Sequence, residues 1–251
     1  MYTKKIILTV ITTFVIISCN VKTADYYVEK GMECTRKKDY QCAVENYTFA
    51  IELDKIQSTF KNPTQLYVYR GNSYYFIKKY DDALADFNSA LSIDDKNFDA
   101  YFWRGRTLYV LKKYDIAIAD FNLAIKFCSN DNDYKASCYF WRGVAYTLCN
   151  KCDSAINDLK IAISLNDKND NSTYYYSRGV AYNLCEKYNF AINDLNTAIK
   201  IDSTFDDYYY VRGKIYQKIN LPDSALADFE KAAYLGNEKA IKELKKYEKE
   251  R

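Results

Sequence analysis

Few of the side chains that usually carry out chemistry occur in this chain in a useful arrangement. The 251 residues include no histidine, which removes the commonest metal ligand and the usual general base of a serine or cysteine nucleophile. The seven glycines occur singly, so no glycine-rich loop is present that would bind phosphate. Carboxylates are abundant, but they fall in predicted turns and loops and at one repeated position. We therefore predict no catalytic residue, no metal site, no cofactor and no enzymatic activity.

The cysteines are the remaining candidates for chemistry. Cys149 and Cys152 form a C-x-x-C motif, but a single pair without a histidine or a second pair is a poor zinc site. The motif also lacks the strand that precedes a thioredoxin-like redox centre. Cys128 lies in a polar segment and Cys138 follows ten residues later, so we predict a disulfide between them in an oxidising compartment. We interpret three cysteines as small buried apolar residues: Cys34, Cys149 and Cys185.

Arginine and aspartate recur together at a fixed distance, which indicates a structural ion pair. The pairs are 16 residues apart: Arg70 and Asp86, Arg104 and Asp120, Arg142 and Asp158, Arg178 and Asp194, Arg212 and Asp228. Lys30 and Asn46 stand at these two positions in the first copy of the pattern, so both members change together. A half-buried guanidinium needs a carboxylate to offset its desolvation. We therefore predict that each pair joins two neighbouring helices.

These pairs belong to a pattern of about 34 residues that recurs six times. A glycine follows the arginine position in each copy, at Gly31, Gly71, Gly105, Gly143, Gly179 and Gly213. Alanines stand 12 and 19 residues after each glycine, and between them lies a large apolar residue: Tyr47, Phe87, Phe121, Leu159, Leu195 or Phe229. Small residues at facing positions let two antiparallel helices approach closely, and large side chains then fill the remaining space.

This order of small and large residues resembles the tetratricopeptide repeat. The resemblance implies an all-α fold, an α-solenoid of six helix–turn–helix repeats with a C-terminal capping helix. The repeats are expected at residues 24–57, 64–97, 98–131, 136–169, 172–205 and 206–239, and the capping helix at 238–250. Loops are expected between them at 58–63, 132–135 and 170–171. The turns predict N-caps for the second helices at Asp81, Asp115, Asp153 and Asn189, with Pro222 in that position in the last repeat.

In tetratricopeptide proteins the first helices of the repeats line a groove that binds a peptide or a helix. The corresponding positions here predict a largely aromatic surface made of Val68, Asn72, Tyr75, Phe76, Phe102, Arg106, Tyr109, Phe140, Tyr176, Asn183 and Tyr210. Apart from Asn72, the residues that clamp a carboxylate in chaperone-binding members of the family are missing. An aromatic groove is typical of binding to an apolar peptide or an amphipathic helix. The alternative is that some of these rings pack against neighbouring repeats.

Residues 1–18 have the features of a secretory signal peptide. Two lysines precede an apolar run at 6–17, which is too short for a bilayer, since a spanning helix needs about 20 residues. The sequence IISC at 16–19 resembles the lipobox of bacterial lipoproteins, which implies cleavage before Cys19, acylation of Cys19 and a short tether at 19–23. Asn20, rather than an aspartate, favours the outer membrane. An uncleaved anchor or an ordinary signal peptide is the alternative.

Composition and charge are compatible with one elongated domain that binds a protein. The formal net charge is +3, and two of the lysines lie in the signal peptide, so no basic excess indicates nucleic acid. We predict a lipid-anchored interaction scaffold of the bacterial cell envelope, facing the periplasm. Its partner would be a peptide or helix of another protein, or a multiprotein envelope complex. A ligand-capture protein that holds a small molecule or glycan on the aromatic groove is the alternative.

Overall fold

The computed structural model describes residues 22–57, 60, 62–128, 131–166 and 171–250. The described part contains helices and no strand: α2 (Ala24–Arg36), α3 (Tyr40–Gln57), α4 (Thr64–Phe76), α5 (Tyr80–Ile93), α6 (Phe98–Val110), α7 (Tyr114–Phe127), α8 (Asn132–Leu148), α9 (Cys152–Leu165), α10 (Ser172–Leu184), α11 (Tyr188–Ile201), α12 (Asp206–Lys218), α13 (Pro222–Tyr234) and α14 (Glu238–Glu250). None of these helices is long and apolar enough to cross a membrane. The predicted all-α class is therefore confirmed.

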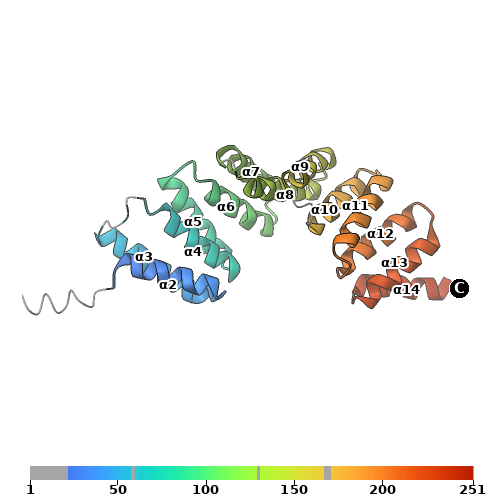
Figure 1. Ribbon diagram of the computed structural model, residues 1–251, viewed down its shortest axis with the longest axis horizontal. Helices are drawn as coiled ribbons and strands as arrows, with labels where there is room; N and C mark the ends of the chain where they lie inside the picture. The colour runs from blue at the N-terminus through green and yellow to red at the C-terminus, as the bar shows by residue number, and fades with distance from the viewer. Residues whose placement is uncertain (1–21, 58–59, 61, 129–130, 167–170, 251) are drawn as a thin grey trace, which may run out of the picture. The chain divides into compact units, whose positions relative to one another are not determined.

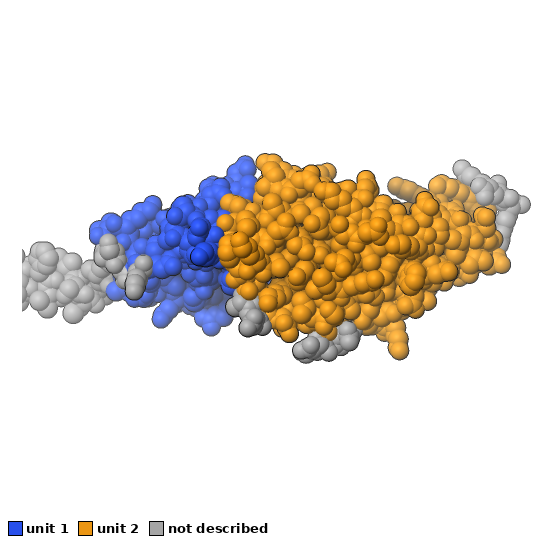
Figure 2. Space-filling view, turned by 90° about the horizontal axis from the view of Figure 1, so that it is seen from above, with its two compact units in different colours: residues 1–100 blue, residues 101–251 orange. Residues whose placement is uncertain are grey.

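The chain divides into two compact units, residues 1–100 and residues 101–251 (Figure 2). Within each unit consecutive helices pair as hairpins, such as α2 with α3 in the first and α8 with α9 in the second (Figure 1). The first helix of a hairpin also contacts the second helix of the hairpin before it, as α10 contacts α9. Stacked hairpins share an apolar core that one hairpin could not form alone. This stacking is the solenoid architecture that the resemblance implied.

The turn inside each hairpin has the same backbone conformation in all six repeats. One residue with a φ between 56° and 63° follows each first helix: Lys38, Lys78, Lys112, Asn150, Glu186 and Asn220. The next amide closes the turn, since the backbone nitrogen of Lys113 donates to the carbonyl oxygen of Leu108 at 2.8 Å. A left-handed residue after a helix satisfies its last carbonyl groups and lets the chain reverse direction within a few residues.

The predicted N-caps of the second helices are wrong by two positions. The N-caps are lysines without a side-chain cap hydrogen bond: Lys79, Lys113, Lys151 and Lys187. The residues predicted as caps lie in the first turn instead: Asp81, Asp115, Asp153 and Asn189. The three carboxylates among them interact favourably with the positive end of the helix dipole. Pro222 likewise follows the N-cap, Leu221. Only in the first repeat does an aspartate cap the second helix within the described residues, because Asp39 Oδ1 accepts from the amide of Cys42 at 3.1 Å.

The six repeated glycines lie where the two helices of a hairpin approach each other most closely. A Cβ atom at Gly31 would lie 2.5 Å from the ring of Tyr47, and one at Gly213 would lie 2.8 Å from the ring of Phe229. These two rings are at most 1% exposed, so they have no open space to move into. The prediction that small and large residues face each other across the hairpin is confirmed. The close packing explains why the helices tolerate glycine, which costs about 1 kcal/mol relative to alanine.

The five predicted arginine–aspartate pairs are confirmed as ion pairs within the hairpins. Each guanidinium donates two hydrogen bonds of 2.6–2.8 Å to the two carboxylate oxygens of its partner. Arg142 donates a third hydrogen bond, of 2.6 Å, to Asn122 in the preceding hairpin, so this pair also links two repeats. In the first repeat Lys30 pairs with Glu33 at 2.7 Å, and Asn46 donates to the carbonyl oxygen of Cys42.

Helix boundaries near the predicted loops and the C-terminus follow from local side chains. α8 begins at Asn132, so residues 132–135, predicted as a loop, are helical. Asp131 explains the difference, because its carboxylate accepts from the amides of Asp133 at 2.9 Å and Tyr134 at 3.2 Å and so caps an extra turn. α14 occupies the residues predicted for the capping helix and buries Ala240 completely against the last hairpin.

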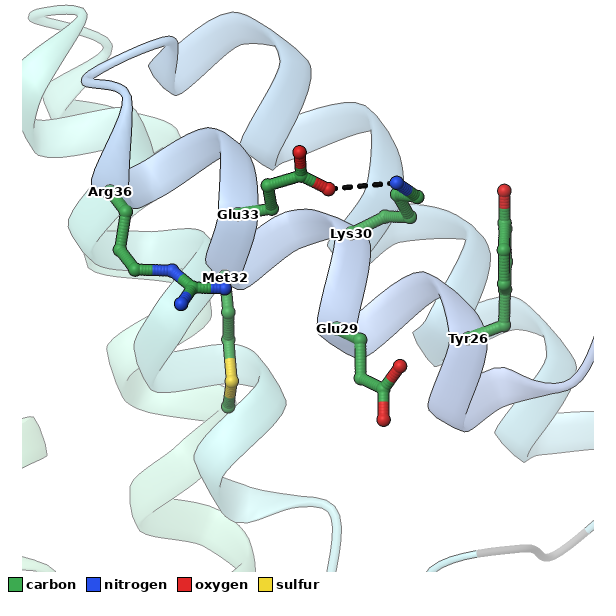
Figure 3. A pocket seen from close by; sticks show the side chains of 6 residues that line it. All are labelled: Tyr26, Glu29, Lys30, Met32, Glu33 and Arg36. Atoms are coloured by element: carbon green, nitrogen blue, oxygen red, sulfur yellow. Dashed lines mark hydrogen bonds and ion pairs between the residues drawn. The ribbon is translucent and has the colours of Figure 1, made fainter.

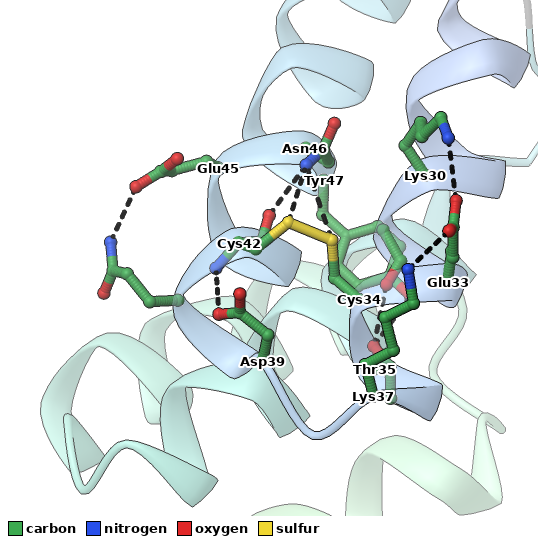
Figure 4. Close-up of a disulfide and its surroundings, with 12 residues drawn as sticks. Lys30, Glu33, Cys34, Thr35, Lys37, Asp39, Cys42, Glu45, Asn46 and Tyr47 are labelled. Carbon is green, nitrogen blue, oxygen red and sulfur yellow. Dashed lines mark hydrogen bonds and ion pairs between the residues drawn. A yellow bond between two sulfur atoms is a disulfide. The ribbon is translucent and has the colours of Figure 1, made fainter.

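The described residues contain two disulfides. One joins Cys34 to Cys42 within the first hairpin, where Asn46 donates toward both sulfur atoms (Figure 4). The other joins Cys152 to Cys185, which belong to consecutive repeats of the second unit. Cys34 is buried, as interpreted from the sequence, but its disulfide was not foreseen. Cys149 and Cys185 are only half-buried, so their interpretation as buried apolar residues is wrong, and Cys185 has a partner sulfur.

The predicted disulfide between Cys128 and Cys138 is also wrong, because both residues are thiols in the structure. Cys138 is fully buried within α8, as expected of a small apolar residue. Cys128 is the C-cap of α7 and is 9% exposed. Both residues are therefore buried core residues. For Cys128 this was not expected, because the segment around it is polar.

Candidate functional site

The first helices of successive repeats in the second unit form one continuous face. α8 contacts α10, and α10 contacts α12. Side chains of α6 reach α8, as described below. We call the surface of α6, α8, α10 and α12 the first-helix face. The predicted binding residues of this unit all belong to these helices: Phe102, Arg106, Tyr109, Phe140, Tyr176, Asn183 and Tyr210.

Arg106 lies between the two tryptophans of the chain. Its guanidinium carbon is 4.6 Å from the ring centroid of Trp103, on the same helix, and 4.6 Å from that of Trp141 on α8. Tyr109 makes an edge-to-face contact with Trp141 at a centroid distance of 5.3 Å. We call these four residues the Arg106 cluster. All four are half-buried, so part of each side chain faces solvent.

The Arg106 cluster combines a permanent positive charge with aromatic surface. Indole rings beside a guanidinium are attracted to it by cation–π interaction, and they hold its plane in a fixed orientation. An oriented guanidinium can hydrogen-bond in its plane to a carboxylate or a backbone carbonyl. The neighbouring rings can contact apolar side chains of the same bound segment. The chemistry of the cluster therefore suits recognition of another molecule.

A row of exposed aliphatic side chains continues the face from the cluster. Val110, Leu148 and Leu184 stand five residues after the repeated glycine in α6, α8 and α10, and are 38%, 47% and 37% exposed. In α12 this position is Lys218, whose ammonium donates to Asn183 Oδ1 at 3.2 Å. We call the three aliphatic residues the apolar row. Aliphatic side chains exposed at the same position of consecutive repeats make a continuous apolar surface, which is typical of a site of interaction.

Two of the predicted binding residues of this unit belong to the core instead. Phe102 and Phe140 are 6% and 9% exposed. Phe102 packs against Phe121, and Phe140 stacks on Tyr174 of the next repeat at a centroid distance of 4.7 Å. The alternative stated for the groove, that rings pack against neighbouring repeats, applies to Phe140, whereas Phe102 packs within its own hairpin. Their prediction as accessible anchors is wrong because this helix position faces the interior of the stack.

The two tyrosines farther along the face are half-buried. Tyr176 lies 5.0 Å from Tyr208 between ring centroids. Burial, reinforced by the nearby Asp207, raises the pKa of Tyr176 to about 12, so its hydroxyl stays neutral under ordinary conditions. Tyr210 contacts the ring of Phe229 at a centroid distance of 6.1 Å. Both tyrosines therefore expose only part of their surface to a ligand.

The first unit carries the other predicted binding residues. Val68 is 1% exposed and is a core residue, so its prediction as a binding residue is wrong. Asn72 and Tyr75 are half-buried. Phe76 is 43% exposed and stacks on Tyr40 of α3 at a centroid distance of 4.5 Å.

A shallow hollow on α2 is lined by side chains of that helix alone, so it is not a cleft between elements (Figure 3). Its lining residues all come from this one helix: Tyr26, Glu29, Lys30, Met32, Glu33 and Arg36. Hydrogen bonds from Lys30 and Lys37 lower the pKa of Glu33 to about 2. Glu33 is thus engaged by a lysine of its own helix and by the C-cap lysine, which is an ordinary arrangement of charges on a helix surface.

Sequence reasoning missed part of the first-helix face. Trp103 and Trp141 stand two residues before the repeated glycine in consecutive repeats, and they are the only tryptophans of the chain. That coincidence of type and position was the available signal. Leu148 and Leu184 could have been found from their positions, which match that of Phe76. The predicted lipidation site, Cys19, lies outside the described residues and stays a prediction.

Two family models match parts of the chain. A model described as TPR repeat matches residues 71–111 and 181–220, and one described as tetratricopeptide repeat matches residues 98–131 and 206–235. The chain therefore contains tetratricopeptide repeats, as the residue pattern implied. The comparison with curated proteins found no match.

Several solved structures share the fold. MamA is 25% identical with a TM-score of 0.59, over 68% of this chain and 96% of that chain. YrrB is 21% identical with a TM-score of 0.63, over 81% of this chain and 100% of that chain. A tetratricopeptide repeat protein from Parabacteroides merdae is 20% identical with a TM-score of 0.55, over 88% of this chain and 96% of that chain. The fold is a tetratricopeptide α-solenoid.

Proposed function

We propose that this chain of tetratricopeptide repeats is a protein-interaction scaffold that binds a segment of a partner protein on its first-helix face. The observation that carries the proposal is the Arg106 cluster, with Arg106 held 4.6 Å from two tryptophan rings beside a row of exposed aliphatic side chains. YrrB, which is similar in fold, is described as having an unusual peptide-binding site. That description concerns YrrB, and it supports a binding role here only by analogy.

The chemistry of the face favours a segment with mixed character. The apolar row provides a surface for aliphatic or aromatic side chains of an amphipathic helix or an extended peptide. Arg106 provides a hydrogen-bond donor for a carboxylate or a carbonyl near the middle of that segment. Interfaces concentrate their binding energy in a few aromatic and arginine residues, and the Arg106 cluster has this composition.

The proposed location is the bacterial cell envelope, with the repeats held at a membrane by lipid on Cys19 and facing the periplasm, most simply at the outer membrane. This part of the proposal rests on the lipobox-like sequence at 16–19. The two disulfides support it, since disulfides form and persist in oxidising compartments outside the cytoplasm. The partner would then be another envelope protein or a multiprotein envelope complex.

A second candidate function, capture of a small molecule or glycan, is favoured by the same aromatic rings. Indole and phenol rings stack on sugars as well as on peptide side chains. The two functions differ in what the protein would retain when it is used to capture molecules from solubilised envelope. A scaffold retains a protein in a stoichiometric ratio, whereas a capture protein retains none and is stabilised against heat by a soluble sugar.

Capture from solubilised envelope with matched variants tests the proposal. The test variant carries Arg106→Glu, Leu148→Glu and Leu184→Glu on the first-helix face. The control carries Ile116→Glu and Phe190→Glu, which replace apolar residues 56% and 61% exposed on second helices of the same unit. The proposal predicts a stoichiometric partner that the wild type and the control retain and the test variant loses. Equal retention by all three would place the binding surface elsewhere.

A further inference from the structure

The Cys152–Cys185 disulfide has a carboxylate beside it. Cys152 is the first residue of α9 and Cys185 is the C-cap of α10, so consecutive repeats bring the sulfurs together. Cys185 Sγ lies 3.8 Å from Asp153 Oδ1. One potential ligand atom from each of the three residues lies within 4.8 Å of the others. Three such atoms this close together could surround a single ion.

We propose that Cys152, Cys185 and Asp153 bind one soft divalent ion, such as Zn²⁺, when the disulfide is reduced. Two thiolates and a carboxylate are ligands that zinc prefers, and three protein ligands leave one tetrahedral position for water. The C-x-x-C motif itself does not form this site, because Cys149 lies outside the cluster. Cys152 is joined instead by Asp153 and by Cys185 from the next repeat.

The geometry of the site is close to what a tetrahedral ion needs. With zinc–sulfur bonds of about 2.3 Å, the two sulfurs would stand about 3.8 Å apart. The Cα atoms of the pair are 5.8 Å apart, so side-chain rotation can open the sulfurs to this distance with little movement of the backbone. The adjustment therefore stays within the two cysteine side chains.

Access and charge also fit an ion. The side chain of Asp153 is 85% exposed and lines a hollow of 410 Å³ beside α9, so an ion can reach it from solvent. Two thiolates and a carboxylate around a divalent ion leave a net charge of about −1. The ammonium of Lys187 lies 3.0 Å from Asp153 Oδ1 and offsets that charge.

The disulfide and the metal-bound state exclude each other. A dithiol reductant transfers two electrons and two protons to the disulfide, which becomes two thiols while the reductant becomes a disulfide. Binding of the ion then releases both thiol protons, because the ligands are thiolates. Metal loading at this site would therefore report whether the surroundings of the protein are reducing. This inference does not depend on the proposed binding of a partner.

Cobalt(II) absorption tests the site, because thiolate coordination gives a charge-transfer band in the near ultraviolet. The full chain is used with Cys34→Ser and Cys42→Ser, so that reduction opens only the disulfide between Cys152 and Cys185. After reduction with a phosphine, we expect one Co²⁺ per chain and displacement of Co²⁺ by Zn²⁺. The unreduced protein should show no band.

Variants identify the ligands and keep the test decisive. Cys152→Ser should abolish the band, and Asp153→Asn should weaken Co²⁺ binding by about tenfold or more, the scale on which loss of a supporting group weakens metal sites. Cys149→Ser is the matched control, since this thiol lies three residues before Cys152 and outside the cluster, and it should keep the band. Helical circular dichroism checks folding in each case. Absence of a band in the reduced protein, no effect of Asp153→Asn, or loss of the band in Cys149→Ser would each overturn the proposal.

Discussion

The arginine–aspartate pair shows how one residue can hold two helices and two repeats at once. Arg142 donates at 2.6 Å and 2.7 Å to the two oxygens of Asp158 and at 2.6 Å to Asn122. The side chains of Arg142 and Asp158 are 18% and 3% exposed, so neither charge has much water around it. Because each charge is desolvated, loss of one partner should cost more than loss of both.

We expect Arg142→Ala to lower the free energy of unfolding by about 3 kcal/mol, because it leaves the carboxylate of Asp158 buried without its partner. Adding Asp158→Ala should recover part of this loss. The control is Lys151→Ala, whose pair with Asp115 is exposed and should contribute less than about 1 kcal/mol. Urea denaturation of the wild type, the three single variants and the double variant measures these changes. Strictly additive effects of Arg142→Ala and Asp158→Ala would show that the two residues are not coupled.

Tyr176 predicts a loss of stability at high pH. Burial, and next the charge of Asp207, raise its pKa in the folded chain to about 12, while in the unfolded chain the pKa is about 10. Stabilisation from the neutral hydroxyl is complete below pH of about 10. Above that pH the unfolded chain releases the proton first, so the free energy of unfolding falls by up to about 2–3 kcal/mol as pH approaches 12.

Tyr176→Phe removes the ionisable group and should remove this loss. We expect the variant to gain stability relative to the wild type by about 1 kcal/mol or more between pH of about 9 and about 11. Chemical denaturation at the two pH values provides the comparison. A difference between the proteins that does not change with pH would mean that the tyrosine is better solvated than its burial indicates.

At the scale of elements, the spacing of the two helices in a hairpin is set by the residue opposite each glycine. At Gly213 a Cβ atom would lie 2.8 Å from the ring of Phe229, whereas at Gly179 it would lie 3.2 Å from the side chain of Leu195. Both side chains are fully buried, but the aromatic ring is wider and more rigid, so it has less freedom to move away from an added Cβ atom. Both hairpins belong to the second unit, which makes them a matched pair.

We expect Gly213→Ala to lower the free energy of unfolding by about 2 kcal/mol, because overpacking exceeds the gain in helix propensity. Gly179→Ala should change it by less than about 1 kcal/mol, since the leucine needs to move only slightly. Phe229→Leu should restore part of the loss in Gly213→Ala. Thermal denaturation followed by circular dichroism gives the order, and equal losses at the two glycines would contradict this explanation of the spacing.

Features that depend on one hairpin could be predicted from the sequence, and features that depend on how hairpins stack could not. The glycines and the arginine–aspartate pairs recur at one spacing in successive repeats, so the pattern indicated their contacts. The pairing of Cys152 with Cys185, and the place of Trp141 beside Arg106, depend on the register between neighbouring repeats. The N-caps were misplaced because the helices begin at Tyr80 and its equivalents, before the carboxylates that usually mark a helix start.

The candidate binding face was predictable only in part for the same reason. The resemblance indicated the helices that form the first-helix face, and Arg106 and Tyr109 are half-buried on it. Phe102 and Phe140 are buried instead, because Phe102 packs against Phe121 in its own hairpin and Phe140 stacks on Tyr174 of the next repeat. Sequence alone does not distinguish a ring that points into the core from one that points along the face.

At the scale of the whole molecule, the proposed anchor determines where the repeats act. Two or three acyl chains hold a protein firmly on a membrane, because each buried methylene contributes about 0.8 kcal/mol. Cys19→Ala should therefore yield a protein that is uncleaved or released from the membrane and that takes up no labelled palmitate. Palmitate labelling of this variant at the level of the wild type would refute the anchor. The repeats should fold equally well in both proteins.

Site-specific photo-cross-linking tests the central claim, partner binding on the first-helix face, most directly. A photoreactive amino acid is placed at Val110, in the apolar row on α6, or at Ile116, on α7. Val110 is 38% exposed and Ile116 is 56% exposed, so exposure alone would favour reaction at Ile116. The account predicts one protein adduct from position 110 in intact envelope, absent when Arg106→Glu is added, and none from position 116. An adduct from position 116 with none from position 110 would contradict it.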